Sequence, residues 1–119
     1  MNPTPTVSVA PGHFTTKAEV LGEIAGDDLW PVTVHQDGFA AAPLHCHDAA
    51  VRIYVFSGTL LVSGGRRQPA IVAGAGARID IPAGAAHTVS AEARVVTITA
   101  FASSAGAAGL PQLPVSEDA

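Results

Sequence analysis

Cysteine, charge and aromatic side chains are all scarce in this chain. Among 119 residues there are one cysteine, one tryptophan and one tyrosine, and only 13% of the residues are charged. The single cysteine, Cys46, excludes a framework of internal disulfides. Lysine and arginine form no run, their only adjacent pair is Arg66-Arg67, and the net charge is −4. These features argue against binding to nucleic acid.

Long apolar runs are missing as well. No stretch is long enough to cross a bilayer, and the N-terminus lacks a charged segment followed by an apolar one. We therefore expect a cytoplasmic protein that binds neither membrane nor nucleic acid. Nearly half of the residues (48%) are apolar, and glycine (12) and proline (9) are plentiful. Such a composition is typical of a folded domain with many turns.

Short β-branched runs separated by turn residues fill the middle of the chain. Val51 to Phe56 is one such run and Val95 to Phe101 is another, and turns follow at short, even intervals. This pattern predicts an all-β sandwich or barrel in a single domain. Residues 17–26 fit either a helix or a strand. We expect an N-terminal arm over residues 1–17, a barrel over 18–101 and a flexible C-terminal tail over 102–119.

Two motifs in the barrel region carry the chemistry. His45 and His47 are two residues apart, so a strand would point both side chains to one side. The second motif runs from Gly76 through Pro82-x-Gly84 to a third histidine, His87. Proline ends a strand ladder, and glycine supplies a turn with positive φ, so this motif turns the chain and begins a new strand at the histidine.

In order and spacing, the two motifs resemble those of the cupin superfamily. His45, His47 and Gly58 fit the first cupin motif, although Gly38 lies one residue too far from His45. Gly76, Pro82, Gly84 and His87 fit the second. The resemblance covers roughly residues 30–101. Two positions depart from it, because Val51 stands where cupins have a glutamate ligand and Ala91 stands where they have an asparagine.

The resemblance implies a cupin-type jelly-roll β-barrel with a divalent metal ion bound by His45, His47 and His87. Imidazole suits several metals, so Mn, Ni, Zn and Cu are possible beside the favoured Fe(II). His35 is a candidate for a residue that supports the metal-binding histidines without binding the metal itself. The resemblance further implies a small apolar pocket. Its expected lining residues are Val51, Ile53, Val55 and Val89.

Losing the glutamate changes the chemistry that the resemblance implies. Three neutral histidines leave the charge of a divalent ion uncompensated, which favours an anionic chelating substrate. The leading hypothesis is a small metal-dependent enzyme, either similar to non-haem Fe(II) dioxygenases or an isomerase, lyase or cyclase. The alternative is a non-catalytic cupin that binds or senses a small molecule, with its metal lost or structural. Because the 51–56 run is apolar on both faces, we also expect a homodimer.

Overall fold

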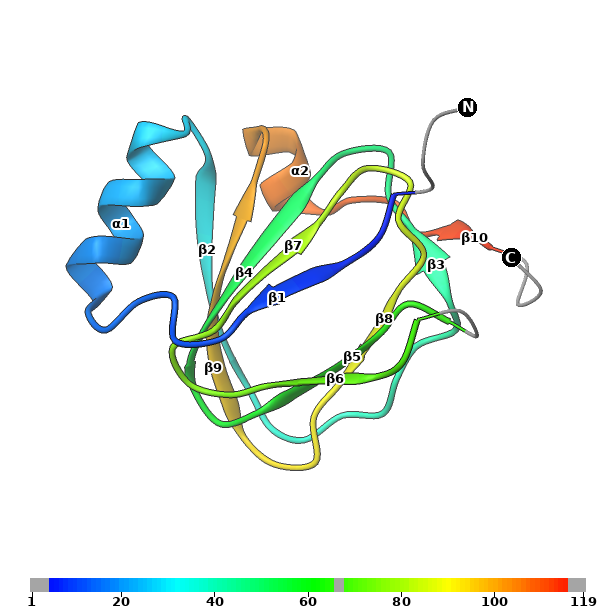
Figure 1. Cartoon of the computed structure of the whole chain (residues 1–119). Helices are drawn as coiled ribbons and strands as arrows, with labels where there is room; N and C mark the ends of the chain where they lie inside the picture. Colours follow the sequence, from blue (N-terminus) through cyan, green and yellow to red (C-terminus); the bar gives the residue numbers. More distant parts are fainter. Residues whose placement is uncertain (1–4, 66–67, 116–119) are drawn as a thin grey trace.

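Two antiparallel β-sheets face each other in the computed structural model, which describes residues 5–65 and 68–115 (Figure 1). The larger sheet has five strands in the order β1-β7-β4-β9-β2, and the smaller has three in the order β6-β5-β8. The five strands are β1 (Ser8–Ala10), β7 (Arg78–Ile81), β4 (Val51–Ser57), β9 (Val95–Phe101) and β2 (Trp30–Gln36). The three are β6 (Ile71–Ala73), β5 (Leu60–Ser63) and β8 (Thr88–Ser90). This arrangement confirms the predicted all-β class.

Four further elements lie outside these two sheets. Strands β3 and β10 pair with each other at one end of the molecule, and the two helices lie outside the barrel (Figure 1). These elements are β3 (His45–Cys46), β10 (Leu113–Pro114), α1 (Lys17–Gly26) and α2 (Ser104–Ala108). None of the helices in the described part of the chain is long and apolar enough to cross a membrane.

Side-chain alternation along β4 separates two cores. Ile53 and Val55 point between the sheets and pack with Ile79, whereas Tyr54 points to the outer face of the larger sheet. Tyr54 and Val55 are both fully buried. The outer face of β4 is therefore covered, as its apolar sequence predicts.

Helix α1 provides that cover. Its Val20 and Ile24 pack against Tyr54, and its first turn is closed by a capping box in which Thr16 and Glu19 bond reciprocally. The stretch that fits either a helix or a strand is thus a helix. Because the same chain covers β4, the apolar outer face of this strand no longer supports a homodimer.

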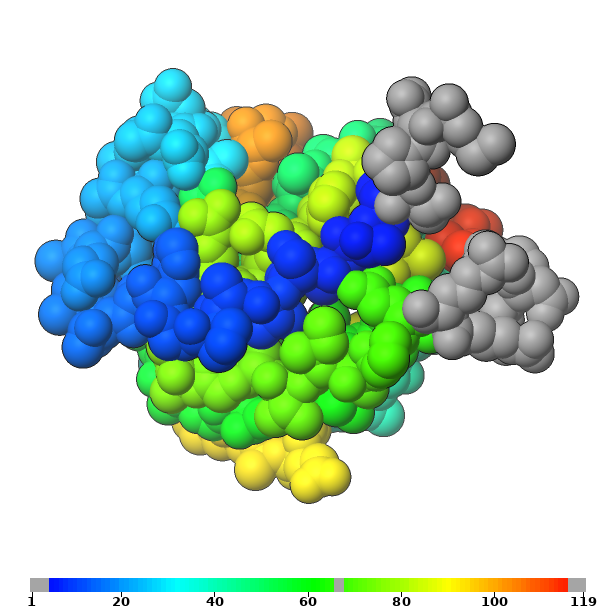
Figure 2. Space-filling view, in the orientation of Figure 1, coloured from blue at the N-terminus to red at the C-terminus, as the bar shows by residue number. Residues whose placement is uncertain are grey.

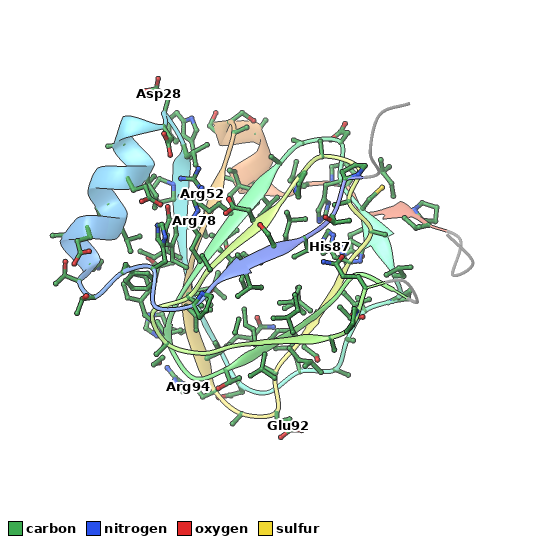
Figure 3. The ribbon with its side chains drawn as sticks, viewed as in Figure 1. Asp28, Arg52, Arg78, His87, Glu92 and Arg94 are labelled. Carbon is green, nitrogen blue, oxygen red and sulfur yellow. The ribbon has the colours of Figure 1, made fainter. Side chains whose placement is uncertain are left out.

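Ion pairs link α1 to the larger sheet, and Figure 3 labels the two arginines that form them, Arg52 and Arg78. Glu23 accepts hydrogen bonds from Tyr54 Oη at 2.6 Å and from Arg78 Nη1 at 2.6 Å, and Arg52 bonds to Asp27 at 2.8 Å. Burial alone would raise the pKa of Glu23, but hydrogen bonds from Tyr54 and His13 and the charge of Arg78 lower this pKa to about 2. Burial and the bond to Glu23 raise the pKa of Tyr54 to about 12.

The described segments near each end of the chain pair with other strands of the same chain. In the N-terminal arm, β1 pairs antiparallel with β7 of the same chain and forms one edge of the larger sheet, on the face seen in Figure 2. Beyond residue 101, where we expected a flexible tail, the chain forms α2 and then β10, which pairs with β3. The two ends of the sequence, 1–4 and 116–119, and the basic pair Arg66-Arg67 lie outside the described residues.

Candidate metal centre

Three histidines meet at the end of the barrel where β3 lies. His45 and His47 come from β3 and the residue after it, and His87 precedes β8. The backbones of His45 and His87 form an antiparallel bridge, in which His87 N donates to His45 O at 2.8 Å. One ring nitrogen from each histidine lies within 4.8 Å of the other two. The two sequence motifs, forty residues apart, therefore converge on one point as predicted.

Each imidazole is oriented by a backbone carbonyl. The Nδ1 atom of every histidine lies 2.9 Å from a carbonyl oxygen, to which an Nδ1–H would donate. The acceptors are the carbonyls of Pro43 for His45, Pro111 for His47 and Ala85 for His87. This arrangement assigns the proton to Nδ1 and leaves each Nε2 free as a metal ligand.

The turn at residues 82–85 sets the position of His87. Gly84 has φ +79°, the left-handed conformation that the sequence motif predicts. Its backbone N–H donates to His47 O at 2.8 Å, and Ala85 N–H donates to Pro82 O at 3.0 Å. The turn therefore forms a hydrogen bond with the backbone of His47 from the first motif, and it also sets the position of His87 from the second.

The electrostatics of the site suit a divalent cation. Burial lowers the pKa of His87, and the charges of His45 and His47 lower this pKa further, against the opposing effect of the hydrogen bond to the Ala85 carbonyl; the net lowering favours the neutral ring. Neutral imidazole is the form that binds metal. Two nitrogens at about 2.1 Å from one ion lie at most about 4.2 Å apart, so small side-chain movements would bring all three into coordination. The residues present thus fit a metal ion.

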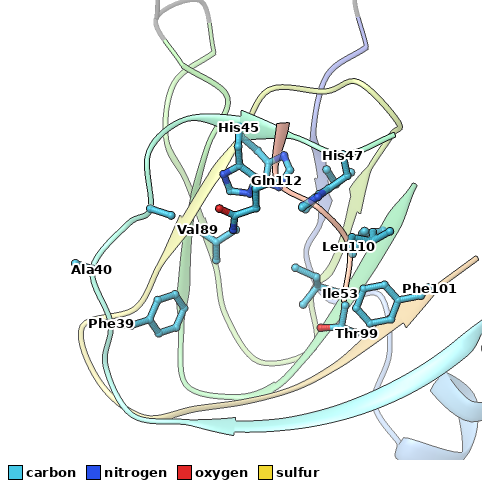
Figure 4. Close-up of a pocket in the computed structure, with 14 residues that line it drawn as sticks. Phe39, Ala40, His45, His47, Ile53, Val89, Thr99, Phe101, Leu110 and Gln112 are labelled. Carbon is cyan, nitrogen blue, oxygen red and sulfur yellow. The ribbon is translucent and has the colours of Figure 1, made fainter. Parts of the chain in front are cut away.

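A cavity of about 410 Å³ opens beside the three histidines (Figure 4). Its volume is in the range of small-molecule sites. Of the residues expected to line a pocket, Val51, Ile53 and Val89 lie in the wall of this cavity, whereas Val55 packs in the core. Val51 lies in the wall at the position where the cupin motif has glutamate. Among the described residues, no charged side chain lines this cavity.

His35 lies away from this centre. Its side chain belongs to the exposed face of β2, and Nδ1 is 3.5 Å from Arg94 Nη2. Strand parity explains the difference, because the neighbouring Val34 is the residue that turns inward to line a cavity. His35 is neither part of the histidine cluster nor a lining residue of its cavity.

Several lining residues escaped the sequence analysis. They come from the loop before β3, from β9 and from the C-terminal segment: Phe39, Ala40, Thr99, Phe101, Leu110 and Gln112. The alternation of β9 could have indicated Thr99 and Phe101, which share one strand face. Nothing local in the sequence brings residues 110–112 to the site, since their placement depends on the pairing of β10 with β3.

Comparisons with solved structures identify the fold. A cupin superfamily protein from Desulfitobacterium hafniense superposes with a TM-score of 0.52 and 10% identity over 85% of this chain and 81% of that chain. A DUF861 family protein from Thermotoga maritima gives a TM-score of 0.55 and 14% identity over 78% and 96% of the two chains.

A conserved protein of unknown function from Streptococcus pyogenes is also similar, with a TM-score of 0.53 and 18% identity over 61% of this chain. The superposition spans 62% of the length of that protein. No protein-family model matches the sequence, and no curated protein matches it. At these identities the likeness concerns the fold, and this chain has the jelly-roll fold of the cupins.

Proposed function

We propose that the protein is a small cupin-type enzyme that depends on a divalent metal ion bound by His45, His47 and His87. One observation carries the proposal: three imidazoles have their Nδ1 atoms at backbone carbonyls and their remaining nitrogens close together. Histidines that had no role in metal binding would not need to bring their ring nitrogens close together. Backbone acceptors that fix ring orientation are typical of metal-binding histidines.

The ion that we propose is Fe(II), with Mn, Ni, Zn or Cu as alternatives. Imidazole binds all of these, so the ligand set does not choose between them. Three protein ligands would leave an ion able to bind further groups, and the cavity beside the histidines would be large enough for a small chelating molecule.

The positive charge expected at the proposed metal site favours an anionic substrate. Three neutral ligands leave a divalent ion with its full charge, and no described acidic side chain lines the cavity to reduce it. When bound, the ion would act as a Lewis acid toward a chelating enolate or carboxylate, and iron would add dioxygen chemistry. The chain itself contributes the orientation of the ligands and an apolar wall, formed partly by Val51 and Ile53, that limits water around the substrate.

A second candidate function is non-catalytic binding of a small anion or sugar-sized molecule. The absence of a described acid or base in the cavity lining, apart from the histidines, favours it. A binder needs no group that moves protons. Turnover separates the two candidates, because an enzyme consumes a β-diketone or aromatic acid, whereas a binder shows only thermal stabilisation by the same compound.

We also propose a homodimer formed through β2. This strand is one edge of the five-stranded sheet, and Trp30 at its start is 53% exposed. An unpaired edge with a large apolar side chain is suited to pairing with a second copy. Light scattering coupled to gel filtration would give twice the chain mass for the wild type and a lower mass for Trp30→Lys.

The metal proposal is tested by elemental mass spectrometry on protein purified without a histidine tag. We expect near-stoichiometric first-row metal in the wild type and none in His45→Ala/His87→Ala. His35→Ala is the matched control, because it removes an exposed histidine outside the cluster and should retain the metal. If the wild-type protein takes up no iron, nickel, manganese or zinc after anaerobic reconstitution, the hypothesis of a metal-dependent enzyme is wrong.

A further inference from the structure

The C-terminal segment 109–114 forms part of the wall of the metal centre. Leu110 and Gln112 both line the cavity. Between them, the Pro111 carbonyl lies at hydrogen-bond distance from His47 Nδ1. The segment continues into β10, where Leu113 pairs with Cys46 and Pro114 with His45. Gln112 is therefore held between two positions that are both fixed against β3.

The side chains of residues 110 and 112 both reach the cavity. Leu113 does not line it and is 41% exposed. The Gln112 carboxamide is directed into the cavity lined by the histidines (Figure 4). No side-chain hydrogen bond between described residues engages it.

Gln112 is also unusual among the lining residues in its chemistry. Apart from the three histidines, the polar lining side chains are Thr99 and Gln112. Thr99 lies near Ile53 and Phe101, away from the β3 end (Figure 4), whereas Gln112 follows the residue that bonds to His47. A glutamine offers two N–H donors without a charge. It can bind an anion without adding to the positive charge of the site.

We propose that Gln112 is a specificity-determining residue, whose amide N–H donates to an oxygen of a carboxylate or enolate bound beside the three histidines. This inference rests on the proposed metal site and adds the class of ligand that the site selects. It assigns polar recognition to the C-terminal segment, because Val51 provides no polar group at the position of the missing glutamate. A ligand with at least two oxygen atoms satisfies the metal and Gln112 together.

Oxalate binding to the Co(II)-loaded protein tests the role of Gln112. Titration followed by the visible absorption of Co(II) would give the oxalate affinity of the wild type, Gln112→Ala and Gln112→Glu. Loss of one hydrogen bond to a charged oxygen should weaken binding by about ten-fold in Gln112→Ala. Gln112→Glu should weaken oxalate binding more, because its carboxylate repels the anion. Leu113→Ala is the matched control on the same segment and should bind oxalate like the wild type.

Metal affinity, measured separately by competition with a chromophoric chelator, distinguishes failure of this inference from failure of the metal site. We expect Gln112→Ala to bind Co(II) within about two-fold of the wild type, since Gln112 is not one of the three ligands. Unchanged oxalate affinity in Gln112→Ala would overturn the role of Gln112 while leaving the metal site intact. A wild type that does not bind Co(II) would overturn both the metal site and this inference.

Discussion

His47 and the carbonyl of Pro111, 64 residues further along the chain, lie at hydrogen-bond distance: Nδ1 is 2.9 Å from the oxygen. His45 and His87 find their carbonyl acceptors two residues away in their own segments. The ring orientation of His47 therefore depends on the C-terminal segment, which is remote in sequence. Removing that segment should affect one ligand of the proposed centre and leave the local bonds of the other two in place.

Deletion of residues 110–119 should weaken metal binding by about ten-fold or more, because loss of a group that orients a ligand commonly costs that much. Competition between the protein and a chromophoric chelator measures this change. Leu113→Ala is the control, since it removes a side chain of the segment but keeps the Pro111 carbonyl. A truncated chain that stays folded and binds metal as tightly as the full chain would show that Pro111 has no part in orienting His47.

The network around Glu23 predicts an acid-sensitive attachment of α1. The pKa of Glu23 is about 2 in the folded protein, below its ordinary value of 4.5. A lowered pKa means that the ionised carboxylate stabilises the fold above about pH 4.5 and that this contribution is lost as the pH falls toward 2. Glu23→Gln should lower the free energy of unfolding at pH 7 by on the order of 1–2 kcal/mol, after allowance for solvent screening.

Urea unfolding at pH 7, 4 and 3 measures the effect. The difference between wild type and Glu23→Gln should shrink as the pH falls, because protonation removes the charge that the substitution removes. Glu92→Gln, at an exposed site, should change the free energy of unfolding by less than about 0.5 kcal/mol. A difference between wild type and Glu23→Gln that stays constant across this pH range would contradict the assigned pKa.

Much of the fold and of the histidine cluster could be predicted from the sequence because the signals are local. His45-x-His47 and Pro82-x-Gly84-x-x-His87 each determine a side-chain direction or a turn within a few residues. Helix α1 could also have been identified, since Thr16 and Glu19 have the spacing of a capping box. Leu110 and Gln112 could not be predicted as lining residues, because the small and polar residues after residue 101 do not indicate that β10 pairs with β3.

Val51→Glu should restore the carboxylate that the cupin motif contains at this position. Val51 is 8% exposed and lines the cavity. In metal-free protein the buried charge should destabilise the fold, by roughly 2 kcal/mol or more. With a divalent ion bound, the carboxylate should compensate part of its charge, so metal affinity should rise and the affinity of the loaded protein for oxalate should fall.

Val51→Gln is the matched control, since it has the same shape as the glutamate without its charge. Thermal unfolding with and without Zn(II) would show a larger metal-induced rise in Tm for Val51→Glu than for Val51→Gln. If the two variants gained equally from the metal, position 51 would lie too far from the ion to contribute a ligand.

Gly84→Ala tests the turn that joins the two motifs. Gly84 has φ +79°, and a Cβ there would have only an ordinary contact, 3.7 Å from Pro5 Cγ. The cost should therefore arise from conformation, about 1–2 kcal/mol for a side chain in the left-handed region. Because the Gly84 N–H donates to His47 O, a shifted turn should also weaken metal binding.

Gly22→Ala is the same substitution at a position where we expect it to stabilise the protein instead of destabilising it. Gly22 lies within α1, and a Cβ there meets no other atom within 4 Å. Alanine should stabilise this position by roughly 0.5–1 kcal/mol, because it restricts the unfolded chain and favours the helix. Metal affinity should not change. Chemical denaturation of both variants, with chelator competition for the metal, measures the two effects. Equal stability of Gly84→Ala and wild type would mean that the turn tolerates a side chain, and that glycine at residue 84 does not determine the position of His87.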